Sequence, residues 1–248
     1  MAEAQALSDD TLLDGRLRLK QPRRGYRVAI DPVLLAAAVP ARSGQTVLDV
    51  GCGTGAAALC LASRVAGCTI VGLEKSVETA GIARLNVLAN GLADRVEIVD
   101  GDVAAPPKQV RLPFDHVMSN PPYLPDTAGN VPSHAGRCGA HVESLDLGTW
   151  VAACLRRLRQ GGRLTLIQRA DRVADLTAAL HGRAGDVSIF PLWPRAGVAA
   201  RRVVVLARKG SRSPARLLPG LVLHRDDGSF TAEAEAIMRD GAPIEVLA

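Results

Sequence analysis

The chain has 248 residues, a length suited to one large α/β domain or two small ones, and 48% of them are hydrophobic, enough for a full core. The chain has 30 Lys and Arg against 25 Asp and Glu, which gives a net charge of +5. This charge agrees with a polyanionic partner without requiring one. Five cysteines without a C-x-x-C pair argue against a zinc knuckle and a disulfide framework, so we expect no metal.

Charge is unevenly distributed in the first part of the chain. Residues 1–14 are acidic, and residues 16–30 are predicted to form a short, strand-like basic segment interrupted by Pro22. The cations of this segment are Arg16, Arg18, Lys20, Arg23, Arg24 and Arg27. Such a run either holds the phosphates of a nucleic acid or forms a solvated face, and Arg24 and Arg27 are the candidates for substrate contacts.

Strand and helix patterns then alternate along most of the chain. The predicted strands are Thr46–Val50, Thr69–Leu73, Val96–Val99, Phe114–Ser119, Arg163–Gln168, Val187–Phe190 and Arg202–Ala207. The predicted helices are Asp31–Val39, Thr54–Val65, Ser76–Asn90, Leu147–Leu158, Asp171–Leu180 and Ala232–Met238. This alternation indicates a Rossmann-like, doubly wound α/β fold with a mostly parallel, seven-stranded sheet and helices on both faces.

Several helix ends carry signals in the sequence. Asp31 is expected to be the N-cap of its helix, with Pro32 at the first helical position, where a missing N–H costs nothing. Gly91 is expected to end one later helix, and Gly161-Gly162 another. These signals predict where the loops of the fold begin.

A glycine-rich turn follows the strand Thr46–Val50. Asp49 lies two positions before the first of three glycines in the spacing G-x-G-x-G, namely Gly51, Gly53 and Gly55. Glycines let a ligand lie against main chain, and ligands of open α/β sheets bind at this end of the strands. A pyrophosphate would gain nothing from Asp49, whereas an ammonium or a sulfonium would. The turn therefore favours S-adenosylmethionine over NAD as the cofactor.

Two further carboxylates stand at the ends of the next two strands. Glu74 is placed to accept hydrogen bonds from ribose hydroxyls, and Asp102 is placed to reach the exocyclic amine of an adenine. Asn120 follows the next strand along the chain and is expected to contact the same cofactor. Tyr26 is a candidate to cover the cofactor, with a packed core aromatic as the alternative. Acidic residues at successive strand ends strengthen the assignment of S-adenosylmethionine.

The sequence Asn120-Pro121-Pro122-Tyr123 follows the strand Phe114–Ser119 and is either a plain loop or the site of the chemistry. Two prolines keep the backbone extended, which leaves the Asn120 side-chain oxygen and the Pro121 carbonyl free to accept hydrogen bonds. Two acceptors suit a planar –NH₂ group, whose delocalised lone pair makes it a poor nucleophile. Tyr123 offers a stacking face for a planar acceptor, and Pro122 is a second candidate substrate contact.

These motifs resemble class I methyltransferases that carry an N-P-P-Y motif. The resemblance rests on Asp49–Gly55, Glu74, Asp102 and Asn120–Tyr123, and it covers roughly residues 12–240. It extends to the tRNA1(Val) adenine N6-methyltransferase family through Lys20-Gln21-Pro22, Tyr26-Arg27, Asp31, Leu34-Leu35, Leu223-His224, Asp227-Gly228 and Phe230-Thr231. The resemblance implies methylation of an adenine next to the anticodon of a tRNA, with Asn120–Tyr123 holding the base.

Three other functions are left open. The N-P-P-Y motif is shared with glutamine methyltransferases of peptide release factors, but those carry a helical domain before the cofactor domain. Here 45 residues precede the first strand, and they are basic rather than a helical bundle. A non-catalytic RNA-binding module would bind the cofactor without turnover, and a dehydrogenase would bind NADH instead of S-adenosylhomocysteine.

The domain organisation follows from these assignments. We expect a cofactor-binding methyltransferase domain over residues 41–210, preceded by a basic extension over residues 1–40 that covers the active site. Residues 211–248 are expected to form a tail that packs on the same domain, and residues 124–143 are a candidate lid. Neither a secretory signal nor an apolar run of membrane length is recognisable, so we expect the cytoplasm.

Overall fold

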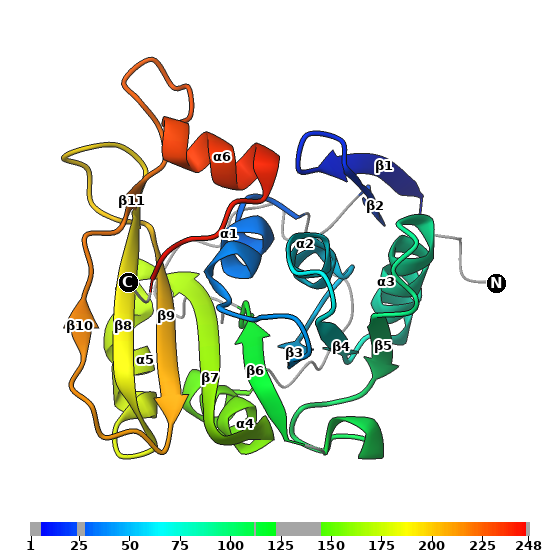
Figure 1. The fold of residues 1–248 in the computed structure, drawn as a ribbon, viewed down its shortest axis with the longest axis horizontal. Coiled ribbons are helices and arrows are strands. Elements are labelled where there is room, and N and C mark those ends of the chain that lie inside the picture. The colour runs from blue at the N-terminus through cyan, green and yellow to red at the C-terminus, as the bar shows by residue number, and fades with distance from the viewer. Residues whose placement is uncertain (1–5, 24–27, 112, 123–144, 247–248) are drawn as a thin grey trace, which may run out of the picture.

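A computed structural model describes residues 6–23, 28–111, 113–122 and 145–246 (Figure 1). The strands are β1 Leu7–Leu12, β2 Leu17–Pro22, β3 Thr46–Val50, β4 Thr69–Glu74, β5 Val96–Asp100, β6 Phe114–Ser119, β7 Leu158–Arg169, β8 Ala184–Trp193, β9 Arg202–Lys209, β10 Arg216–Leu217 and β11 Leu221–Val222. The helices are α1 Asp31–Ala38, α2 Ala56–Arg64, α3 Val77–Ala89, α4 Leu147–Arg157, α5 Val173–Leu180 and α6 Ala232–Asp240, with 3-10 turns η1 Lys108–Val110 and η2 Ala170–Arg172.

The described residues form a central sheet of nine strands in the order β10-β8-β9-β7-β6-β3-β4-β5, with β11 also paired to β8. Every pairing in this sheet is parallel except those of β9, which runs antiparallel to β7 and β8. The predicted mostly parallel α/β architecture is confirmed. The predicted number of seven strands is too low, because β10 and β11 have two residues each and so show no readable period.

Helices cover both faces of the sheet (Figure 1). Along β3 the buried residues alternate between two clusters, since Val47 packs with α1 and α2 whereas Leu48 and Val50 pack with α4 and α5. The same alternation places Asp49 on the α1 and α2 face, at the end of β3 where the chain turns into α2. None of the described helices is long and apolar enough to cross a membrane.

Helix α1 begins one residue earlier than its cap signal predicts. Ile30 is the N-cap, and Asp31 is already helical, with no side-chain capping bond at this end. The Asp31 carboxylate instead pairs with Arg202 of β9, at 3.0 Å from its Nε atom. The prediction of Asp31 as N-cap is therefore wrong, because a cation from a distant strand binds the side chain that a local cap would have used.

Gly161-Gly162 also differs from its predicted role. Helix α4 ends at Arg157 and β7 starts at once, so the two glycines lie inside β7 instead of ending the helix. The register between β6 and β7 shifts here, from Phe114 opposite Leu158 to His116 opposite Arg163. A glycine pair permits such a bulge because a β-carbon on Gly162 would lie 2.9 Å from a neighbouring carbonyl oxygen.

The N-terminal hairpin β1–β2 explains the segregated charges of the sequence. Its register places Asp9 opposite Lys20, and the two side chains form an ion pair. Arg16 lies beside the end of α6, where it pairs with Asp240 at 3.3 Å. Of the basic run, Lys20 and Arg16 therefore have acidic partners within the chain.

Asn86 of α3 and Asn90, the C-cap residue of that helix, bind the backbone of β2. The Asn86 amide accepts from the Lys20 N–H at 2.7 Å and donates to the carbonyls of Lys20 and Thr54, both at 2.9 Å. Asn90, one helical turn further, accepts from the Arg18 N–H at 2.9 Å and donates to its carbonyl at 2.8 Å. The fully buried Asn86 thus ties the hairpin to the glycine-rich turn.

Replacing Asn86 by alanine is expected to lower the free energy of unfolding by about 3 kcal/mol, because backbone groups of Lys20 and Thr54 lose their partner in a buried place. The matched Asn90→Ala change, at a partly exposed position, should cost about 1 kcal/mol because water replaces the lost bonds. Urea unfolding of both variants measures the difference. Equal losses at the two positions would contradict a special role for Asn86.

Candidate active site

Glycine conformations and backbone bonds shape the turn after β3. The N–H groups of Gly51 and Cys52 both donate to the Leu73 carbonyl, at 2.8 and 3.1 Å, which holds the turn against the end of β4. Gly51 has φ +71°, a conformation that side chains disfavour, and a β-carbon there would lie 3.2 Å from the Trp150 ring. The turn therefore needs glycine at Gly51 both for its backbone and for its packing.

Asp49 and Glu74 meet at this turn. Glu74 accepts from the Gly53 N–H at 3.0 Å through Oε2 and from the Ser76 N–H at 2.9 Å through Oε1. Asp49 is 2% exposed, and its Oδ2 atom has no hydrogen-bond partner among the described residues. Burial, and then the charge of Glu74, raise the pKa of Asp49 from 3.8 to about 7.

This pair of carboxylates fits the predicted cofactor. A buried carboxylate oxygen without a donor is costly, and a ligand ammonium placed against Asp49 would supply the missing partner. Glu74 keeps a second lone pair on each oxygen for ribose hydroxyls. The structure thus brings Asp49, Glu74 and the glycines of the turn together at the carboxyl end of β3 and β4, where ligands of such sheets bind.

Asp102 lies at the same edge of the sheet, after β5. Its Oδ2 atom pairs with Lys75 Nζ at 2.9 Å, and its Oδ1 atom accepts from the Ala104 N–H at 2.9 Å. The hydrogen bond with Lys75 lowers the pKa of Asp102, so the group is ionised. The contact of Asp102 with an adenine amine stays a prediction. Such a contact must use the carboxylate lone pairs that Lys75 and the Ala104 N–H do not occupy.

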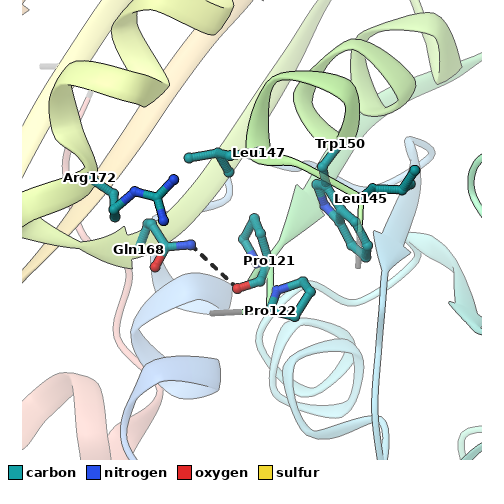
Figure 2. Close-up of a pocket in the computed structure, with 7 residues that line it drawn as sticks. All are labelled: Pro121, Pro122, Leu145, Leu147, Trp150, Gln168 and Arg172. Carbon is teal, nitrogen blue, oxygen red and sulfur yellow. Dashed lines mark hydrogen bonds between the residues drawn. The ribbon is translucent and has the colours of Figure 1, made fainter. Parts of the chain in front are cut away.

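Asn120 directly follows β6, beside the end of β3. Its Oδ1 atom is buried and has no hydrogen-bond partner among the described residues, as expected for an acceptor whose donor is a substrate group. The Pro121 carbonyl is not wholly free, because the Gln168 amide donates to it at 3.4 Å (Figure 2). A carbonyl oxygen has two lone pairs, so one remains for a substrate.

Trp150 of α4 connects this segment with the glycine-rich turn. Its indole N–H donates to the Ser119 hydroxyl at 3.1 Å, and that hydroxyl donates to the Val50 carbonyl at 2.7 Å. The ring also packs on Gly51, as the distance above shows. Figure 2 shows the small pocket beside the two prolines, lined by Pro121, Pro122, Leu145, Leu147, Trp150, Gln168 and Arg172.

Sequence reasoning predicted only the two prolines of this pocket, and the overlooked residues include Trp150 and Gln168. Trp150 reads as an ordinary core aromatic, and Gln168 reads as the last residue of a strand. The signal for Gln168 was present, because the carboxyl ends of neighbouring parallel strands meet at one edge and β7 pairs with β6. Trp150 had no such signal, since its contact depends on how α4 packs.

Four of the predicted contacts lie outside the described residues. They are Tyr123 of the N-P-P-Y motif and Arg24, Tyr26 and Arg27 of the basic segment. The candidate lid, residues 124–143, also lies outside them.

Comparison with known proteins identifies the family. The family model of the methyltransferase small domain matches residues 27–187. A tRNA1(Val) (adenine(37)-N6)-methyltransferase of Aeromonas salmonicida is 30% identical, over 87% of this chain and 90% of that protein. The protein of the same name from Aeromonas hydrophila is 31% identical, over 84% and 87%.

Among solved structures, the crystal structure of a predicted O-methyltransferase from Agrobacterium tumefaciens matches with a TM-score of 0.72 and 29% identity, over 86% of this chain and 98% of that chain. The fold and the family model agree with the resemblance found in the motifs, and a dehydrogenase is set aside. The chain therefore belongs to the methyltransferase small-domain family, as an S-adenosylmethionine-dependent enzyme related to the tRNA1(Val) (adenine(37)-N6)-methyltransferases.

Proposed function

We propose that the protein methylates the exocyclic N6 nitrogen of an adenine in tRNA, next to the anticodon. The observation that carries this proposal is the buried Asn120 Oδ1 atom beside the Pro121 carbonyl, at the edge where the glycine-rich turn lies. This oxygen has no hydrogen-bond partner in the part of the chain that the structure describes. The names of the Aeromonas relatives support the choice of tRNA and of adenine. The proposed place of action is the cytoplasm, in keeping with an RNA substrate.

Asp49, Glu74 and the glycine-rich turn would hold S-adenosylmethionine, which supplies a methyl group on a positively charged sulfur. In this assignment the Asp49 carboxylate binds the ammonium of the methionine part, because charge and burial favour that pair. Glu74 binds the ribose, and its bonds to the backbone of Gly53 and Ser76 keep it oriented. Asp102 is proposed to bind the adenine amine.

Asn120 and Pro121 would hold the acceptor amine. Both of its N–H groups donate, one to Asn120 Oδ1 and one to the Pro121 carbonyl, which directs the nitrogen lone pair toward the methyl group. As the C–N bond forms and the C–S bond breaks, positive charge develops on the nitrogen, and the two oxygens stabilise it. One N–H proton then leaves to water, so no dedicated general base is required.

Two acceptors favour an amine over a hydroxyl, although the Agrobacterium structure is described as a predicted O-methyltransferase. A hydroxyl carries a single hydrogen, so either Asn120 Oδ1 or the lone pair of the Pro121 carbonyl that Gln168 does not bind would be left without a donor. In a buried site an unsatisfied acceptor costs about 1–3 kcal/mol, which disfavours that substrate. The same reasoning predicts that transfer stops after one methyl group, because the product retains only one N–H.

A glutamine amide also carries two N–H groups, so a protein acceptor is the second candidate. The test is to incubate the enzyme with radiolabelled S-adenosylmethionine and either unmodified tRNA or a peptide release factor, and to treat each product with nuclease or protease. We expect label in the tRNA that nuclease releases and protease does not. Label in the release factor, insensitive to nuclease, would replace adenine by glutamine as the acceptor.

A further inference from the structure

Gln168 is the last but one residue of β7, which pairs with β6 just before the Asn120 segment. Its side chain is 2% exposed, and both ends of its amide are bound. The Arg169 backbone N–H donates to Gln168 Oε1 at 2.8 Å, and Gln168 Nε2 donates to the Pro121 carbonyl at 3.4 Å (Figure 2). A buried amide with two partners has one orientation.

That orientation is fixed by chemistry. A backbone N–H can only donate, so the oxygen of the Gln168 amide must face Arg169, and its NH₂ group must face Pro121. Rotating the amide would put oxygen against oxygen at Pro121 and N–H against N–H at Arg169. The bond to Pro121 is longer than the usual 2.7–3.2 Å, which makes it weak but leaves its direction defined.

The Pro121 carbonyl has few other means of orientation. It lies beyond the end of β6 and outside the ladders of the described strands, and the proline that follows lacks an N–H and cannot continue a regular bonding pattern. Gln168 is the donor to this carbonyl among the described residues. The direction of the second oxygen of the amine-holding pair therefore depends on a side chain from the neighbouring strand.

We propose that Gln168 is a positioning residue for methyl transfer, which holds one lone pair of the Pro121 carbonyl so that the other faces the acceptor amine. This role rests on the proposed function, in which the acceptor amine donates one N–H to Pro121 and the other to Asn120. It also explains why a strand-end glutamine is buried beside two prolines in place of an apolar residue.

The test compares three variants with the wild type, by the kcat and KM for tRNA and the Kd for S-adenosylhomocysteine. Gln168→Met keeps the volume and removes the donor. Gln168→Glu keeps the shape, and its carboxyl can donate to Pro121 only when protonated. Thr165→Val is the matched control, because Thr165 is another fully buried polar residue of β7 and its hydroxyl has no partner among the described residues.

We expect Gln168→Met to lower kcat about 10- to 100-fold, with the Kd for S-adenosylhomocysteine unchanged within twofold, because only the orientation of an acceptor is lost. Thr165→Val should match the wild type. The kcat of Gln168→Glu should rise as the pH falls, because protonation of the glutamate restores the donor. The wild-type pH profile should show no such rise. The charged groups around this position are Arg169, Arg172 and Arg202, paired with Asp171, Asp175 and Asp31 respectively.

A wild-type kcat in Gln168→Met would overturn this role, and so would a pH profile of Gln168→Glu that parallels the wild type. If the methionine variant does not fold, as judged by its melting and cofactor binding, the pH profile of the glutamate variant decides. A wild-type enzyme that labels no RNA would instead contradict the proposed function, and the role of Gln168 with it. The wild-type arm therefore separates the two failures.

Discussion

Replacing Asn120 by alanine is expected to lower kcat by a factor on the order of 100 to 1000 while leaving cofactor affinity within a few-fold. In the proposed mechanism the side-chain oxygen that is removed holds the acceptor amine and stabilises the charge that develops on it, whereas the turn after β3 is proposed to hold the cofactor. Single-turnover methylation of tRNA and calorimetry with S-adenosylhomocysteine measure the two quantities separately.

The same variant should be at least as stable as the wild type. Asn120 Oδ1 is buried without a partner in the described structure, so its removal relieves a desolvation cost instead of breaking a bond. A stable protein without turnover would show that this oxygen serves the reaction and not the fold. Loss of cofactor binding with methyl transfer preserved would contradict the role assigned to Asn120.

Replacing Asp49 by asparagine is expected to weaken binding of S-adenosylhomocysteine by about 100-fold, because a buried charge partner of the ammonium is lost. Glu74→Ala should also weaken cofactor binding, since it removes the proposed ribose contact and the bond to the Gly53 N–H. Calorimetry at pH 8, where Asp49 is ionised, gives the affinities. Unchanged affinity in both variants would show that the cofactor binds elsewhere.

The raised pKa of Asp49, about 7 against 3.8, also sets two pH dependences. Between about pH 4 and pH 7 the folded protein keeps a proton that the unfolded chain releases, so the contribution of Asp49 to stability falls over this range, by about 4 kcal/mol, and is constant above it. Cofactor affinity changes in the opposite sense and rises with pH, because the carboxylate binds the ammonium. Both contributions should be absent from Asp49→Asn, so the wild type and the variant should differ in their pH profiles. Urea unfolding and calorimetry of both proteins from acid to alkaline pH measure the difference, and parallel profiles would contradict the raised pKa of Asp49.

Much of the fold and of the cofactor site could be predicted because their signals are local. The strands β3 and β6 are short and largely buried, and the predicted ranges coincide with the observed ones. Asp49, Glu74 and Asn120 each follow or end such a strand, so the parallel topology alone brings them to one edge. Identifying the strands therefore sufficed to assemble these residues.

The remaining features depend on partners that are distant in sequence. Strand β1 was overlooked because its acidic residues lack an apolar period, and the ion pair of Asp9 is with Lys20 of the paired strand. Asp31 gives a local capping signal that Arg202 overrides. The Pro121 carbonyl looked free because no local pattern shows that the amide of Gln168 reaches it.

The most direct test of the proposed function is the identity of the labelled nucleoside. After incubation with labelled S-adenosylmethionine, unmodified tRNA would be digested to nucleosides and separated by chromatography against standards, with the Asn120→Ala enzyme as the control. Label in N6-methyladenosine, absent with the control enzyme, is the result we predict. Label in a different methylated nucleoside, such as a ring-nitrogen or ribose-oxygen product, would contradict an amine held by Asn120 and Pro121.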